Sequence, residues 1–235
     1  MIFFLIVLIL TIIYLYSFYR YKRVTSIKYW KYRNQYRLKN IKNSLKEVYD
    51  VITSHKFLIG GTMLGCYRNS DIIPFDDDID IGIYLGNKDV KTVINETKKD
   101  LQKLNDKYWI EDAFFGLKIR SKINKADIDI FLYSDFKDGF IRAHNLSARK
   151  IWPNEYYFKN EILNLSKGKI GENYYNIPSN SEIIMERHFG KDWGTPRITH
   201  LHIDEPYVFE YKFVDYFNYL VVYICDKLKI DNKVK

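Results

Sequence analysis

The stretch FLIGGTMLGCYRNSDIIPFDDDIDIGIY, residues 57–84, decides how this chain folds. From Asp78 onward it alternates acidic and aliphatic residues in the order Asp-Ile-Asp-Ile-Gly-Ile. Alternation with a period of two is typical of a β-strand, in which residues i and i+2 face the same side. We therefore expect Asp78 and Asp80 to point to one face of a sheet and the intervening isoleucines to point to the other.

The two acids predict a metal site. Carboxylates at this spacing lie about 7 Å apart along one strand and repel each other. Hard cations such as Mg²⁺ and Mn²⁺ prefer oxygen ligands and relieve that repulsion. Asp76 is in phase with the pair and extends it, although Pro74 delays the start of the strand. We expect Mg²⁺ or Mn²⁺ at Asp76, Asp78 and Asp80.

Two other interpretations of the acidic cluster fit less well. A solvated acidic loop does not require interleaved aliphatic residues. A calcium loop of the EF-hand type matches Asp76, Asp78 and Asp80 at its first, third and fifth positions. Such a loop then requires Gly at its sixth and Glu at its twelfth position, where this chain has Ile81 and Asn87. The metal-binding strand is the better interpretation.

The first half of the stretch predicts a phosphate-binding turn. Gly60, Gly61 and Thr62 directly follow the apolar run 57–59 and lead into a helical segment, so they indicate a strand, a turn and a helix. Glycine lets backbone N–H groups approach a ligand closely, and N–H groups at the start of a helix favour phosphate. We expect a phosphate on this turn and a metal ion between that phosphate and the acids.

Together, the two motifs resemble the signature of the LicD/fukutin-type phosphotransferases, which have the nucleotidyltransferase fold. That signature reads roughly Gly-Thr-Leu-Leu-Gly-x-x-Arg and then Ile-Pro-Trp-Asp-Asp-Asp-Ile-Asp-Ile-Gly, and Phe75 stands here where the family usually has Trp. The matching positions in this chain are Gly61, Thr62, Leu64, Gly65, Arg68, Ile73, Pro74, Asp76, Asp77, Asp78, Asp80 and Gly82. The resemblance implies an α/β or α+β domain with a mixed sheet flanked by helices. We assign phosphate or nucleotide binding to Gly60, Gly61, Thr62 and Arg68.

A third carboxylate is expected from a second alternating strand. Residues 126–133, ADIDIFLY, place Asp127 and Asp129 on one face. The family resemblance puts the third acid in an Ile-Asp-Ile-Phe-Pro segment, which points to Asp129, although Leu132 replaces the proline. An edge strand carrying two half-exposed acids is the alternative. Whether Asp129 acts as the base for an acceptor hydroxyl or as a metal ligand stays open from the sequence.

The net charge of +8 comes from one end of the chain. Residues 1–46 contain ten Lys and Arg residues and no acid, which leaves 27 basic and 29 acidic residues beyond them. A nucleic-acid-binding domain requires a basic surface on the domain itself. We therefore expect no nucleic-acid partner.

An apolar, uncharged segment at 2–19 predicts a membrane anchor over residues 1–19. A helix of that length spans about 27 Å, which is just enough to cross a bilayer. No small-residue cleavage site follows, so we expect an uncleaved single-pass anchor, with a buried core helix as the alternative. A basic juxtamembrane segment at 20–40 and a catalytic domain at 41–235 complete the predicted organisation.

The side of the membrane that carries the domain stays open. The basic flank favours the cytoplasm, whereas the resemblance implies a lumenal domain for the eukaryotic relatives and a cytoplasmic one for the bacterial relatives. Farther along the chain, Arg187 and Lys191 are expected either to bind phosphate or to lie on the surface. The last predicted helix, at about 208–228, is amphipathic and too short for a second span.

The family resemblance implies metal-dependent transfer of a phospho-alcohol, such as phosphocholine, ribitol phosphate or glycerol phosphate. The donor would be a CDP-alcohol and the acceptor a sugar or glycoconjugate hydroxyl, with Asp78, Asp80 and Asp129 as catalytic residues. One alternative is transfer of the nucleotide itself to a small molecule. The other is an inactive membrane-tethered binding module, which the retention of all three carboxylates disfavours.

Overall fold

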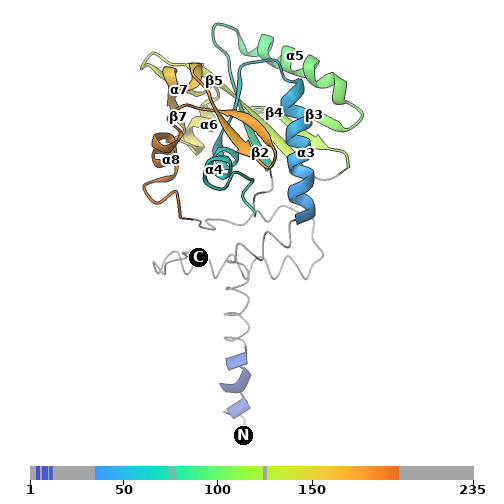
Figure 1. Cartoon of the computed structure of the whole chain (residues 1–235), viewed down its shortest axis with the longest axis vertical. Helices are drawn as coiled ribbons and strands as arrows, with labels where there is room; N and C mark the ends of the chain where they lie inside the picture. The colour runs from blue at the N-terminus through green and yellow to red at the C-terminus, as the bar shows by residue number, and fades with distance from the viewer. Residues whose placement is uncertain are drawn as a thin grey trace. The chain divides into compact units, whose positions relative to one another are not determined.

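The fold is taken from a computed structural model that describes residues 4–5, 7–9, 11–12, 35–74, 76, 78–123 and 126–195. The chain divides into two compact units, Asn34–Gly194 and a second one made of Met1–Arg33 together with Thr195–Lys235. The predicted helix at 208–228, most of the 20–40 segment and Asp77 lie outside the described residues. The first unit contains both motifs and is the domain described below (Figure 1).

A seven-stranded mixed sheet forms the centre of this domain. Its main order is β1-β2-β5-β4-β3, with β6 paired to β5 and β7 paired to β6. Only the β2–β5 pair is parallel among these strand pairs of the described residues. A separate hairpin pairs β8 with β9. The strands are β1 (Lys56–Leu58), β2 (Asp78–Tyr84), β3 (Tyr108–Ala113), β4 (Gly116–Ser121), β5 (Asp127–Asp135), β6 (Phe140–Ala143), β7 (Tyr156–Phe158), β8 (Ser166–Ile170) and β9 (Asn173–Ile177).

Helices flank the sheet, which confirms the predicted mixed α/β class (Figure 1). The predicted change from strand to helix after β1 is present, but Gly60, Gly61 and Thr62 form the first turn of α4 rather than a separate turn before it. Asp89 caps α5 by accepting a hydrogen bond from the backbone N–H of Thr92. The helices are α3 (Gln35–Val51), α4 (Gly60–Asn69), α5 (Val90–Leu101), the 3₁₀ turn η1 (Gln102–Leu104), α6 (Leu146–Ile151), α7 (Lys159–Leu163) and α8 (Ser181–Phe189).

One face of the sheet is aliphatic and forms the main core. The residues that alternate with the acids are fully or almost fully buried: Ile79, Ile81, Ile83, Ile128, Ile130 and Leu132. Helix α3 covers this face, since Glu47 accepts a 3.0 Å hydrogen bond from Tyr108. Helix α5 lies on the same side, where Lys98 pairs with Asp112 of β3. The acids of β2 and β5 are thereby directed to the opposite face, which we call the acidic face.

The predicted anchor is described only in part. Residues 4–5, 7–9 and 11–12 are helical, and their apolar side chains are exposed. Within the described part of the chain, no helix is both long enough and apolar enough to cross a membrane. The remainder of the 2–19 stretch lies outside that part, so the span stays a prediction.

Candidate active site

The parallel pairing of β2 with β5 brings the predicted acids together. Asp78 lies opposite Asp127, and Asp80 lies opposite Asp129. One carboxylate oxygen from each of Asp78, Asp80 and Asp129 lies within 4.8 Å of the other two. Oxygen ligands at this separation fit around a single Mg²⁺ or Mn²⁺ ion with small adjustments. We call these three residues the acid cluster.

The first turn of α4 lies directly against the acids. A Cβ atom on Gly60 would be 2.7 Å from Oδ2 of Asp80, and one on Gly61 would be 2.9 Å from Oδ2 of Asp76. Gly60 also has a φ of +52°, which favours glycine. A side chain at Gly60 would be strained by this backbone conformation, and one at Gly61 would have to displace the carboxylate of Asp76. The positive end of the helix dipole then faces the carboxylates of Asp76 and Asp80.

The other two predicted phosphate-binding residues have different surroundings. Thr62 is fully buried, and its hydroxyl accepts a 2.9 Å hydrogen bond from the backbone N–H of Asp80. This bond fixes the strand that carries Asp80 to the start of α4. Arg68 lies in the last turn of α4, away from the acids, and donates to the carbonyl of Trp193 at 3.4 Å. Phosphate binding by Thr62 and Arg68 stays a prediction.

The electrostatics of the acid cluster fit a bound cation. Burial raises the pKa of the Asp80 carboxyl well above its ordinary range, and the negative charges of Asp78 and Asp76 raise it further. Burial also raises the pKa of Asp129, although the neighbouring Lys118 opposes that shift. A divalent cation removes the cost of holding these charges close together, because it favours the ionised carboxylates.

Two basic residues of β4 belong to the same face and escaped sequence analysis. Lys118 lies opposite Asp129, and Arg120 lies opposite Asp127. Lys118 contacts Asp129 at 3.0 Å, and Arg120 contacts Asp127 at 2.9 Å. The two acids of β5 therefore differ. Asp129 pairs with Lys118 and belongs to the acid cluster, whereas Asp127 pairs with Arg120 and does not. The alternation Lys-Ile-Arg in β4 indicates that both basic side chains lie on one face of the sheet. Which acids they meet depends on the register of β4 with β5.

Glu155 was also missed, because it precedes a short strand without any motif. It is partly buried and accepts a 2.7 Å hydrogen bond from the hydroxyl of Tyr133. Burial raises its pKa to about 7. Its charge in turn raises the pKa of Asp80, so it contributes to the negative potential behind the acid cluster.

Residues 54–180 match the family described as LicD/FKTN/FKRP, nucleotidyltransferase domain. The match covers more than half of the 235-residue chain and includes the α4 turn and all three members of the acid cluster. The chain belongs to this family. Membership indicates a domain of the nucleotidyltransferase type.

Similar sequences occur among curated bacterial proteins. An uncharacterized protein of Rickettsia typhi is 29% identical over 164 residues, which are 65% of this chain and 47% of that protein. An uncharacterized protein of Rickettsia prowazekii is 29% identical over 133 residues, which are 54% of this chain and 45% of that protein. The LicD-family chain therefore spans about half the length of the curated relatives it matches.

Solved structures with a similar arrangement are remote from this LicD-family domain. The CdnC:HORMA-deltaN complex of E. coli MS115-1 matches with 12% identity and a TM-score of 0.33, over 72% of this chain and 47% of that chain. The DncV cyclic AMP-GMP synthase of Vibrio cholerae, with a linear intermediate, matches with 16% identity and a TM-score of 0.28, over 72% of this chain and 53% of that chain. Structural similarity at these TM-scores gives no information about activity.

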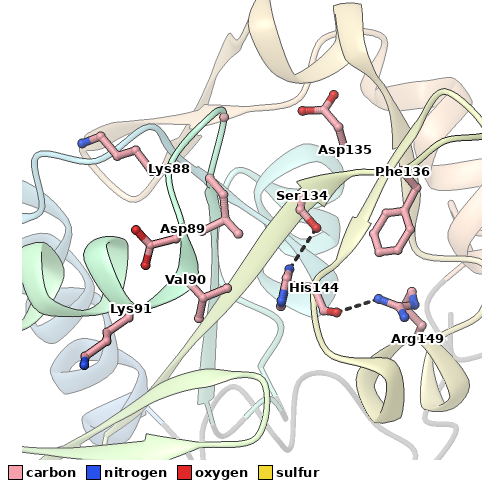
Figure 2. A pocket seen from close by; sticks show the side chains of 11 residues that line it. Lys88, Asp89, Val90, Lys91, Ser134, Asp135, Phe136, His144 and Arg149 are labelled. Carbon is pink, nitrogen blue, oxygen red and sulfur yellow. Dashed lines mark hydrogen bonds between the residues drawn. The ribbon is translucent and has the colours of Figure 1, made fainter.

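A cavity of about 730 Å³ lies elsewhere in the LicD-family domain, where β2 and β5 end. Figure 2 shows Ser134 of β5 directed at the ring of His144, with a distance of 3.2 Å between Oγ and Nδ1. Arg149 donates to the carbonyl of His144 at 2.6 Å. None of the predicted site residues lines this cavity. It is therefore a separate feature, at the opposite ends of the strands that carry the acid cluster.

Proposed function

We propose that this protein is a membrane-anchored, metal-dependent phosphotransferase. It moves a phospho-alcohol group, of the phosphocholine, ribitol phosphate or glycerol phosphate type, from a CDP-linked donor to a hydroxyl of a glycan or glycoconjugate. The observation that carries the proposal is the convergence of Asp78, Asp80 and Asp129 next to the glycine turn of α4. Family membership supports the reaction class.

The residues of the acidic face have distinct roles in this proposal. Asp78, Asp80 and Asp129 hold Mg²⁺ or Mn²⁺. A bound ion would neutralise the negative charge of the diphosphate and of the CMP leaving group. Because one oxygen of Asp129 converges with those of Asp78 and Asp80, we assign Asp129 as a ligand rather than as the base.

The glycine turn binds the donor phosphate. Backbone N–H groups in the first turn of a helix lack partners within the helix and point toward its N-terminus. Gly60 and Gly61 bring these groups next to Asp80 and Asp76. A phosphate held there lies beside the ion that the acids bind, which places the phosphorus close to the charge that stabilises its transfer.

The apolar N-terminal stretch is the proposed anchor. The described residues within it are helical and expose Phe4, Leu5, Val7, Leu8, Ile9 and Ile12. Apolar surface of this kind is typical of a membrane-facing helix. An acceptor glycan carried on a membrane lipid or a membrane glycoconjugate would suit this location.

Thermal unfolding of the full chain with Mn²⁺ and a panel of nucleotides tests the proposal, with Asp78→Asn measured in parallel. Ligand at about a hundred times its Kd adds roughly 2.7 kcal/mol to the free energy of unfolding. We expect a cytidine-selective stabilisation that requires metal and is absent from the variant. No stabilisation by any nucleotide would refute the proposal. Release of pyrophosphate instead of CMP from a productive reaction would indicate nucleotidyl transfer.

A further inference from the structure

Lys118 occupies an unusual position on the acidic face. Its Nζ lies 3.0 Å from Oδ1 and 3.2 Å from Oδ2 of Asp129, so one ammonium contacts both oxygens of a predicted metal ligand. The same Nζ is 3.7 Å from Oδ2 of Asp127. Lys118 is largely buried, with 24% of its side chain exposed. Its position is fixed by the register of β4 with β5, where Lys118 and Asp129 lie opposite each other.

The charges around the acid cluster determine how many cations it can hold. Lys118 places one positive charge directly against the three carboxylates. Arg120 forms its ion pairs with Asp127 and Glu111, which lie outside the cluster, although its charge also favours the ionised form of Asp129. A second ion on Asp129 would have to displace the ammonium, because Lys118 contacts both oxygens.

We infer that Lys118 is the second positive charge of this site: it restricts the acid cluster to one divalent ion and donates to phosphate oxygens of an anionic, nucleotide-linked donor. Lysine suits both tasks, because its ammonium has three donors on a flexible stem. With 24% of its side chain exposed, Lys118 is reachable from solvent. The phosphate-binding part rests on the proposed function, whereas the restriction to one ion does not.

Calorimetric titration of the full chain with Mn²⁺ alone tests the restriction to one ion. We expect one ion per chain in the wild type. Lys118→Met should bind Mn²⁺ about tenfold more tightly, because a competing positive charge is removed. Lys118→Arg should stay close to the wild type. Lys98→Met is the matched control, since it removes an equal charge from an ion pair on the other face of the sheet, and it should change nothing.

Titration with inorganic pyrophosphate at saturating Mn²⁺ tests the second part. Lys118→Met should bind pyrophosphate about tenfold more weakly, because a charge-assisted donor is lost. The variant thus changes the two affinities in opposite directions. A purely structural ion pair predicts weaker binding of both probes, because Asp129 would lose its fixed orientation.

Two results would overturn the inference. One is a stoichiometry of two Mn²⁺ ions in the wild type, a measurement that does not depend on the folding of any variant. The other is Mn²⁺ affinity in Lys118→Met that is unchanged or weaker. Neither experiment requires turnover, so a chain that behaves as expected here but releases no CMP would refute the proposed transferase reaction and leave the role of Lys118 in metal binding intact.

Discussion

Buried acids occur in two parts of this domain with opposite surroundings. Glu161 of α7 is 2% exposed and receives two hydrogen bonds of 3.0 Å from Arg187 of α8 and one of 2.9 Å from the backbone N–H of Phe158. In the acid cluster, by contrast, Asp80 lies among other carboxylates, which raise its pKa. An acid that only stabilises a fold is neutralised by the protein itself, whereas an acid cluster that awaits a cation carries an electrostatic cost until the cation binds.

The largest difference between the two regions concerns catalysis. Asp80→Asn should lower CMP release by at least about a thousandfold, because a ligand of the catalytic ion is lost. Its free energy of unfolding without metal should not fall, since the substitution removes a buried charge that repels its neighbours. Activity assays and urea unfolding measure the two effects.

Asp112→Asn is the control for Asp80→Asn. Asp112 is an acid on the other face of the sheet and pairs with Lys98 at 2.7 Å. This variant should retain wild-type activity. An Asp80→Asn enzyme with more than half of the wild-type rate would remove Asp80 from the catalytic site.

A substitution in the pair formed by Glu161 and Arg187 should instead change the stability of the domain. Arg187→Met leaves Glu161 buried without its partner and should destabilise the domain by about 3 kcal/mol. Mn²⁺ binding per folded molecule should not change. Urea unfolding gives the first value and calorimetry the second. Arg120→Met, which breaks a more exposed pair with Asp127, should cost less than about 1 kcal/mol. Equal losses in the two variants would contradict the contrast between buried and exposed pairs.

The raised pKa of Glu155 predicts that the free energy of unfolding depends on pH, with an effect of intermediate size. Burial raises its pKa from the ordinary 4.5 to about 7, so the folded protein binds a proton in this interval that the unfolded chain releases. The free energy of unfolding therefore falls as the pH rises from about 4.5 to about 7, by about 2 kcal/mol once the partial exposure of the side chain is considered. Above that interval no further loss is expected from this group.

Glu155→Gln removes this contribution. Urea unfolding at pH 5 and pH 8 should show that the wild type loses more stability than the variant between the two values. Asp80 also has a raised pKa, to which the charge of Glu155 contributes, so the difference between the two proteins includes this coupling. Parallel pH curves would show that Glu155 has the same pKa in the folded and unfolded states.

The smallest expected effect concerns the bond between α4 and β2. Thr62→Val leaves the backbone N–H of Asp80 without the hydroxyl that accepts from it, at a cost of about 1 kcal/mol. Thr62→Ser keeps the hydroxyl and is the control. Chemical unfolding of both variants measures this cost. A Thr62→Val variant as stable as the wild type would show that this hydrogen bond contributes no stability.

Local patterns were sufficient to predict the elements that carry the site. The alternation around Asp78 and around Asp129 predicted two strands with acids on one face, and the glycines predicted the change from strand to helix, where they form the first turn of α4. These predictions succeed because side-chain direction follows directly from backbone periodicity. The mixed sheet and the family were confirmed as well.

Contacts between distant segments were not predictable in the same way. The pairing of Lys118 with Asp129 depends on the register between β4 and β5, which no local pattern specifies. Arg187 was expected on the surface or at a phosphate, but its side chain is only 11% exposed and holds Glu161. The surface expectation was wrong because the partner lies in another helix, and its negative charge determines where the arginine goes.

The parallel pairing of β2 with β5 has a consequence for the order of folding. Parallel strands need a crossover, and here the chain between them forms α5, β3 and β4. Closing such a long loop costs entropy before any contact compensates for it, so pairings of this kind form slowly. Asp80 and Asp129 meet only when that loop has closed, and their repulsion then opposes the last step. A divalent ion present during refolding should therefore accelerate the formation of the native sheet.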